Sequence, residues 1–157
     1  MKRGLAALAL LALAGAHAGT FRATVSHVTD GDTLSVRAGR NAPMQVRLLD
    51  LDAPEACQAF GADAGAALRR RVLGETVRVR ARAKDDYGRQ LARIEHRGED
   101  IGRWLVRNGY AWSARFHGRS GPYASLEAQA RRERKGLWGH AQPEDPRSFR
   151  QRHGPCA

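Results

Sequence analysis

The chain has 157 residues, of which 27 are Lys or Arg and 16 are Asp or Glu, so its formal net charge is +11. This length suits one domain with a proper core but not comfortably two. The basic excess suits a polyanionic partner such as nucleic acid, because neutralised phosphates release their condensed counterions. Charge alone does not show that the protein binds nucleic acid, since arginine-rich composition also occurs in proteins that do not bind DNA.

The first 18 residues have the composition of a secretory signal peptide. Lys2 and Arg3 give a positive start, residues 4–15 are almost wholly Ala and Leu, and residues 16–18 (Ala-His-Ala) offer a small-x-small cleavage site. The apolar run is shorter than the roughly 20 residues of a membrane-spanning helix, and an uncleaved membrane anchor is the alternative. The sequence therefore predicts a secreted or periplasmic protein without a membrane segment after cleavage. Its mature chain would begin at Gly19 with 25 basic and 16 acidic residues, a formal charge of +9.

The chain contains two cysteines, Cys57 and Cys156. Export would bring them into oxidising conditions, which predicts a disulfide that ties the C-terminal end to the segment around residue 57. Two unpaired thiols are the alternative, because the sequence does not show whether the two Cα atoms come close enough. Neither the cysteines nor the scattered histidines have the spacing of zinc ligands.

Five strands are predicted where short runs rich in β-branched and apolar residues lie between turn signals. They cover residues 21–28, 33–37, 44–51, 75–82 and 89–96. Short turns join the first three runs, which is typical of an antiparallel meander. The fourth run alternates strictly, and an Asp-Tyr-Gly turn joins it to the fifth.

Three helices are predicted where apolar residues recur at helical spacing. The first begins at Phe60 and stops at Gly74, the second is capped by Asp100, and the third begins at Pro122. The element order, three strands, a helix, two strands and two helices, predicts an α+β fold. We expect a five-stranded OB-like β-barrel with three α-helices.

One folded domain is predicted over residues 19–140. Residues 141–157 are Pro-rich and charged, and we expect an irregular tail there, tied back by a disulfide if Cys156 is bonded. Barrels of the OB type often bind oligonucleotides, but a fold does not by itself establish a function.

Three carboxylates stand out near the turns of the predicted meander: Asp32, Asp52 and Glu55. Adjacent strands can bring them together, and like charges gathered in one place repel and raise each other's pKa unless a cation is bound. Oxygen ligands on loops suit calcium better than zinc. The alternative for Asp-Gly-Asp-Thr alone is an ordinary hairpin turn.

Two arginines lie beside these acids in the sequence. Arg47 precedes Asp52 by five residues, and Arg89 follows the Asp-Tyr-Gly turn. A guanidinium can hold phosphate oxygens with a planar, bidentate pair of donors. A cation and two arginines would together stabilise the charge that develops on a phosphoryl group in its transition state. A single arginine is usually a solvated surface residue, so the hypothesis depends on the arrangement.

Three segments in order carry a family resemblance: residues 30–33 (Asp-Gly-Asp-Thr), 46–55 (Val-Arg-Leu-Leu-Asp-Leu-Asp-Ala-Pro-Glu) and 86–89 (Asp-Tyr-Gly-Arg). They resemble the signature segments of the staphylococcal nuclease (thermonuclease) family. Gly109-Tyr110-Ala111 and Lys135-Gly136-Leu137-Trp138 are similar to weaker landmarks of that family. The resemblance spans residues 21–138 and makes residues 19–140 a nuclease domain.

The resemblance implies a calcium-dependent nuclease that hydrolyses phosphodiester bonds of DNA or RNA and leaves 3′-phosphate ends. It implies that Asp32 and Asp52 bind Ca²⁺ through their carboxylates and Ala53 through its main-chain carbonyl. The family prototype has a threonine where this chain has Ala53. A carbonyl ligand survives that difference, whereas any hydroxyl contact is lost.

The resemblance also implies catalytic and substrate-binding residues. Glu55 would orient or deprotonate the attacking water, and Arg47 and Arg89 would grip the phosphate. Tyr87 resembles a residue near the nucleotide phosphate, and Tyr123 would lie near the base pocket. The segment between the second and third signatures is shorter than in the prototype, which leaves substrate preference open.

Two other classes of protein remain as alternatives. A catalytically inactive nucleic-acid-binding module of the OB type would lack a ligand, the base or an arginine, but Asp32, Arg47, Asp52, Glu55 and Arg89 are all present. A basic structural protein of the cell envelope would leave the three segments as coincidence. We expect a monomer that acts on DNA, RNA or both, with no stable protein partner.

Overall fold

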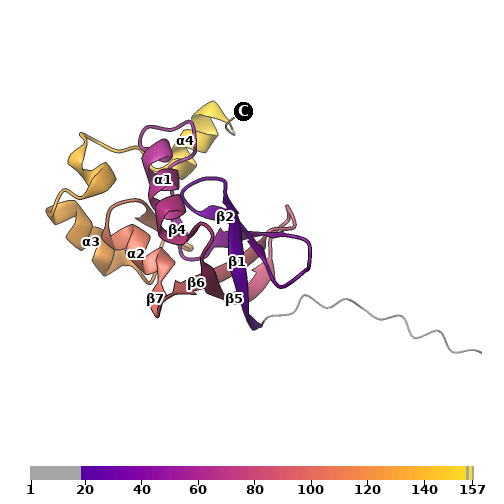
Figure 1. The fold of residues 1–157 in the computed structure, drawn as a ribbon. Helices are drawn as coiled ribbons and strands as arrows, with labels where there is room; N and C mark the ends of the chain where they lie inside the picture. Colours follow the sequence, from indigo (N-terminus) through magenta and orange to yellow (C-terminus); the bar gives the residue numbers. More distant parts are fainter. Residues whose placement is uncertain (1–18, 155, 157) are drawn as a thin grey trace, which may run out of the picture.

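The computed structural model describes residues 19–154 and residue 156. The predicted signal peptide, residues 1–18, lies outside the described residues. Figure 1 shows the chain from β1 to the C-terminal helix, with the strands gathered on one side and the helices on the other. No helix in the described part of the chain is long and apolar enough to cross a membrane.

Five strands form the barrel, and together they confirm the predicted OB-like fold. They are β1 (Thr20–Val28), β2 (Thr33–Arg37), β3 (Met44–Leu48), β5 (Thr76–Lys84) and β6 (Gln90–His96). Their order is β3-β2-β1-β5-β6, and β3 also pairs with β6 in parallel, which closes the sheet on itself. The short strand β7 (Glu99–Asp100) continues from β6.

The barrel core follows the alternation seen in the sequence. On β5, Val77 and Val79 are buried while the arginines between them are exposed, because successive side chains of a strand point to opposite faces. Leu34, Val46 and Ile94 come from three other strands and are fully buried in the same apolar cluster. The barrel interior is therefore filled by side chains.

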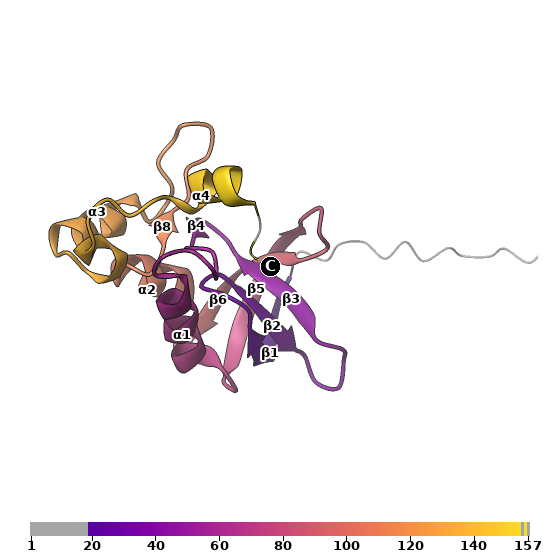
Figure 2. The ribbon, with the colours of Figure 1, turned by 90° about the horizontal axis from the view of Figure 1, so that it is seen from above.

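Helices pack beside this barrel (Figure 2). They are α1 (Gly61–Val72), α2 (Ile101–Arg107), α3 (Ala124–Arg132), the 3₁₀ turn η1 (Gly136–Gly139) and α4 (Pro146–His153). The predicted cap at Asp100 is confirmed, because its carboxylate accepts a 3.0 Å hydrogen bond from the main-chain N–H of Arg103. The first three helices correspond to the three that the sequence predicts.

The third predicted strand is divided in two. β3 ends at Leu48, and the chain turns before a second short strand, β4 (Leu51–Asp52), which pairs with β8 (Trp112–Ser113). Asp50 takes a positive φ of 70° at the turn, a conformation that Asp tolerates better than most residues. Arg93 of β6 holds its carboxylate at 2.6 Å. The turn detaches Asp52 from the barrel sheet.

The prediction of an irregular tail after residue 141 is wrong, because residues 146–153 form α4. Asp145 caps this helix by accepting hydrogen bonds from the main-chain N–H and hydroxyl of Ser148, at 3.0 and 2.6 Å. Pro146 occupies the first turn, where its missing N–H costs no hydrogen bond. Beyond the helix, the structure joins Cys156 to Cys57 by a disulfide.

Candidate active site

Strand pairing brings Asp32, Arg47 and Asp52 together from separate segments. Thr33 pairs with Arg47 across β2 and β3, so Asp32 at the start of β2 lies beside Arg47. One Nη of Arg47 is 2.9 Å from Asp32 Oδ1, and the other is 2.8 Å from Asp52 Oδ1. A single guanidinium therefore bridges the two carboxylates that the sequence proposes as metal ligands.

Asp32 is the most enclosed acid of this cluster, with 2 % of its surface exposed. Its Oδ2 accepts a 3.0 Å hydrogen bond from the main-chain N–H of Ala53, and its Oδ1 accepts one from the hydroxyl of Thr33. Burial raises the pKa of Asp32 to about 7, although the charge of Arg47 acts in the opposite direction. An additional positive charge would keep this carboxylate ionised at neutral pH.

Two glycines allow the loop that carries Ala53 and Glu55 to approach so closely. A Cβ on Gly31 would lie 2.7 Å from the Cβ of Ala53, and one on Gly61 would lie 1.8 Å from the main-chain oxygen of Glu55. The buried Gln58 adds a 3.0 Å hydrogen bond from the Glu55 N–H to its side-chain oxygen. Close backbone packing therefore fixes the position of Glu55.

Arg150 of α4 is a residue of this cluster that the sequence did not indicate. Its guanidinium is 2.9 Å from Asp52 Oδ2, 3.2 Å from Asp52 Oδ1 and 2.6 Å from Glu55 Oε1. These hydrogen bonds, chiefly the one to Asp52, raise the pKa of Arg150 despite its partial burial. The start of α4 has a typical N-terminal sequence, with Asp145 as the cap, Pro146 in the first turn and Ser148 bonded to the cap. No sequence signal relates residue 150 to residue 52, which lies 98 positions earlier.

Arg89 and Tyr87 lie in the turn between β5 and β6, apart from these carboxylates. Arg89 Nε is 2.7 Å from Asp85 Oδ2, and its guanidinium lies 5.3 Å from the centre of the Tyr87 ring. Tyr87 is 85 % exposed. Leu91 pairs with Arg47 across β6 and β3, so Arg89, two residues before Leu91, leaves the strand on the same side as Arg47. Arg89 therefore pairs with Asp85 in this structure and contacts none of the three carboxylates of the cluster among the described residues.

Tyr123 is buried, and its expected place near the base pocket stays a prediction. It is 6 % exposed and belongs to the core cluster, and its hydroxyl donates a 2.9 Å hydrogen bond to Asp100. Burial first, and then the charge of Asp100, raise the pKa of the Tyr123 phenol. The residue packs α3 against the cap of α2.

We expect Tyr123→Phe to reduce the free energy of unfolding by about 2 kcal/mol, because it removes one hydrogen bond to a carboxylate. Chemical denaturation measures this change. If Tyr123 acts in packing alone, the turnover number and KM on nucleic acid should stay within twofold of the parent. A rise in KM without loss of stability would support a place near the base pocket.

The donors in the cluster suit a hard cation. They are carboxylate and main-chain oxygens, without thiolate or imidazole, and calcium takes six to eight oxygens of which several can be water. Within the described ranges, no group of three or more His, Cys, Asp or Glu side chains is arranged to hold a metal ion. Asp32, Asp52 and the main-chain carbonyl of Ala53 are the oxygen donors that would hold a cation. In this structure the guanidiniums of Arg47 and Arg150 pair with the two acids instead.

Fold and site together define a small OB-like barrel protein with acids and guanidiniums gathered beside β2, β3 and β4. The family model described as staphylococcal nuclease homologue matches residues 45–140, more than half of the chain. The chain belongs to the staphylococcal nuclease family, as the three signature segments indicate.

Relatives extend this similarity over nearly the whole chain. The chain is 37 % identical to Protein ParB of Escherichia coli, over 96 % of this chain and 90 % of that protein. It is 33 % identical to a micrococcal nuclease of Shigella flexneri, over 94 % of this chain and 91 % of that protein. An uncharacterized endonuclease of Escherichia coli O157:H7 is 34 % identical, over 82 % of this chain and 84 % of its own length.

Proposed function

We propose that the protein is an exported, calcium-dependent nuclease that hydrolyses phosphodiester bonds of DNA or RNA to products with 3′-phosphate ends. Family membership and the nuclease relatives support a metal-dependent hydrolase that acts on nucleic acid. The observation that carries the proposal is the cluster in which Arg47 bridges Asp32 and Asp52, and Arg150 joins Asp52 to Glu55. The basic charge of the chain suits the substrate.

In the proposed mechanism, Glu55 takes a proton from water as the water attacks phosphorus, and the bond from phosphorus to the 5′ oxygen breaks. The 5′ oxygen takes up a proton and leaves as a hydroxyl, while the phosphate stays on the 3′ end. The main chain of Glu55 is fixed by Gln58 and by the close contact at Gly61, and Arg150 orients its carboxylate through a 2.6 Å hydrogen bond. A bound cation would supply Lewis-acid stabilisation of the phosphoryl oxygens. Proton transfer to Glu55 needs no movement of the main chain.

The arginines have the charge and geometry to bind the phosphate. Arg47 is oriented by Asp32 and Asp52, and because burial is outweighed by these two acids its pKa is raised, so it stays charged. Arg89 stands on the same side of the sheet as Arg47 and can exchange Asp85 for a phosphate oxygen. Two planar guanidiniums would then stabilise charge on the non-bridging oxygens in the transition state.

Export belongs to the same proposal. Residues 1–18 have the composition of a signal peptide, and a bonded pair of cysteines suits an oxidising compartment. We propose a secreted or periplasmic monomer. Mass determination of the protein recovered from culture medium or periplasm, with Gly19 as the first residue, tests this step.

Calcium dependence is tested on the mature protein with plasmid and single-stranded DNA. Cutting should require Ca²⁺, stop with chelator, and leave fragments ending in 3′-phosphate. Asp32→Asn should weaken Ca²⁺ binding, measured by calorimetry with the metal alone, by more than about 100-fold. Loss of even an outer-shell partner costs 10–100-fold, so loss of a direct ligand should exceed that.

The matched control is Asp63→Asn, which removes the same charge from the exposed first turn of α1. This variant should bind Ca²⁺ as the parent does. A parent protein that binds DNA but leaves it intact in Ca²⁺ would favour the alternative, a catalytically inactive binding module. Equal Ca²⁺ affinity in Asp32→Asn and the parent would remove Asp32 from the metal site.

A further inference from the structure

We propose that Arg150 is a third phosphate-contacting arginine of the active site, and that α4 forms one wall of a groove for the phosphate backbone of the substrate strand. The proposal rests on the nuclease function and extends it to residues that no family signature includes. Its starting observation is that Arg150 contacts both Asp52 and Glu55, a proposed metal ligand and the proposed base.

Arg150 retains donors that can reach a phosphate. A guanidinium has five N–H donors, and the three hydrogen bonds to Asp52 and Glu55 employ three of them. The side chain is 36 % exposed, so the remaining donors can meet solvent or a ligand. Arg150 can therefore hold a phosphate oxygen while it orients the acids beside it.

Contacts far apart in the sequence hold α4 against the site. Gln58, which also fixes the Glu55 loop, donates a 2.7 Å hydrogen bond to the main-chain oxygen of Glu144, just before the helix. The Cys57–Cys156 disulfide anchors the chain just after the helix to the same loop. Both ends of α4 are thus tied to the segment that carries Glu55. Figure 2 shows α4 beside β4 and β8.

A cavity of about 660 Å³ opens between α4 and these two strands. The residues that line it include Arg47, Arg115, Arg131, Arg147 and Arg150, together with the ring of Trp112. Two acids among the described residues share the lining: Asp52, which pairs with two arginines in this structure, and Asp145, which caps α4. An arginine-lined groove with an aromatic side chain suits a polynucleotide strand better than a small neutral ligand.

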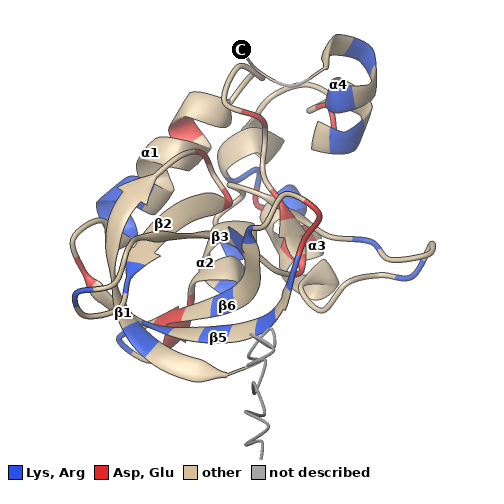
Figure 3. Cartoon of the chain, turned by 90° about the vertical axis from the view of Figure 1, so that its right-hand side faces the viewer, with Lys and Arg blue, Asp and Glu red and all other residues tan. Residues whose placement is uncertain are grey.

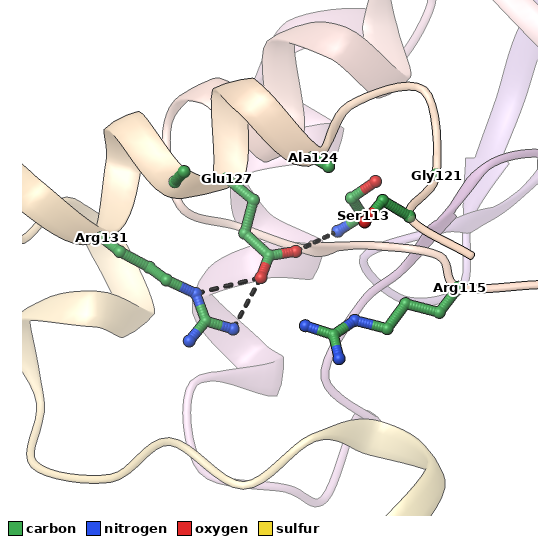
Figure 4. Close-up of a pocket in the computed structure, with 8 residues that line it drawn as sticks. Ser113, Arg115, Gly121, Ala124, Glu127 and Arg131 are labelled. Carbon is green, nitrogen blue, oxygen red and sulfur yellow. Dashed lines mark hydrogen bonds and ion pairs between the residues drawn. The ribbon is translucent and has the colours of Figure 1, made fainter. Parts of the chain in front are cut away.

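The groove extends from α4 toward α3. A second cavity of about 310 Å³ shares Ser113, Arg115 and Arg131 with the first. Figure 4 shows the side chains of Arg115 and Arg131 extending into the same space, with Arg131 bonded to Glu127. Arg115 and Arg147 are exposed, and no acid in the described part of the chain pairs with either. These two are available for backbone phosphates.

Three alanine variants on one helix test the proposal: Arg150→Ala, Arg147→Ala and the control Arg152→Ala. All three lose the same charge from α4, along which basic residues recur (Figure 3). Arg152 pairs with Glu144 and does not line the groove. Turnover and KM are measured with single-stranded DNA of 4 and 16 nucleotides, and DNA affinity is measured by fluorescence anisotropy in chelator across a salt series.

Arg150→Ala should lower kcat/KM at least 10-fold on both substrates. Arg147→Ala should raise KM about fivefold on the longer DNA alone, and reduce the slope of log affinity against log salt by about 0.7, the value for one single-strand phosphate contact. Arg152→Ala should leave kcat/KM, KM and the salt slope at the parent values. The proposal fails if Arg150→Ala has the same kcat/KM as Arg152→Ala. It also fails if Arg150→Ala cuts faster and binds Ca²⁺ more tightly than the parent, because Arg150 then does not assist the reaction.

Failure of the nuclease function gives a different pattern. A parent protein that cuts nothing in any cation contradicts the proposed function, whereas a parent that cuts normally while the α4 variants behave alike contradicts only this inference. The anisotropy measurements need no cutting, so they report on the groove in either case.

Discussion

Glu55→Gln is expected to lower the turnover number by about 10²–10⁴-fold, the range for loss of a positioned general base. The amide has nearly the shape of the carboxylate and can still accept the hydrogen bond from Arg150. Gln58 binds the main chain of residue 55, so its contact persists. The fold should therefore survive, and single-turnover hydrolysis of a labelled oligonucleotide measures the chemical loss directly.

Glu144→Gln provides the matched control, because it removes one negative charge from the segment that precedes α4. Glu144 pairs with Arg152, and its contact with Gln58 uses the main-chain oxygen, which the substitution leaves in place. This variant should turn over within twofold of the parent. If the turnover number of Glu55→Gln stays within threefold of the parent value, another group abstracts the proton. The DNA affinity of the variant is measured beside it and shows whether the site is still formed.

The fold could be predicted from the sequence where local pattern and tertiary structure agree. The alternation of Val77 and Val79 with arginines predicts β5, and Asp100 predicts the start of α2, because each signal acts within a few residues. The sequence does not indicate the break after Leu48, because Leu49 and Leu51 continue the apolar pattern. The carboxylate of Asp50, at the turn, pairs with Arg93, 43 residues further along the chain.

The candidate site also contains residues that local sequence order predicts and one that it does not. Asp32, Arg47 and Asp52 lie on neighbouring strands of a short meander, so sequence order alone suggests that they meet. Arg150 reaches Asp52 across 98 positions through the packing of α4, whose residues are mostly charged or polar. Tyr123 shows the opposite case, because a tyrosine beside a helix start has the same pattern whether its ring is buried or exposed.

Arg47→Ala is expected to lower kcat/KM by about 10³–10⁵-fold, the effect of removing an arginine that stabilises phosphoryl charge. Arg47→Lys should still lose about 10²-fold, because an ammonium is a point charge and cannot bridge Asp32 and Asp52 while offering a planar pair of donors to phosphate. Steady-state kinetics on a defined oligonucleotide, in saturating Ca²⁺, measure both losses.

Stability has to be separated from catalysis in these variants. Removing the guanidinium leaves the buried Asp32 without its main counter-charge, a change that costs about 3 kcal/mol in buried pairs. Arg47→Lys keeps a positive charge beside Asp32, so its loss of stability should be smaller than that of Arg47→Ala while its kinetic loss stays large. Arg71→Lys is the control, because Arg71 makes a 2.6 Å ion pair with Glu99 and contacts no member of the cluster. A kinetic loss in Arg47→Lys no larger than in Arg71→Lys would show that the bidentate bridge plays no part in the reaction.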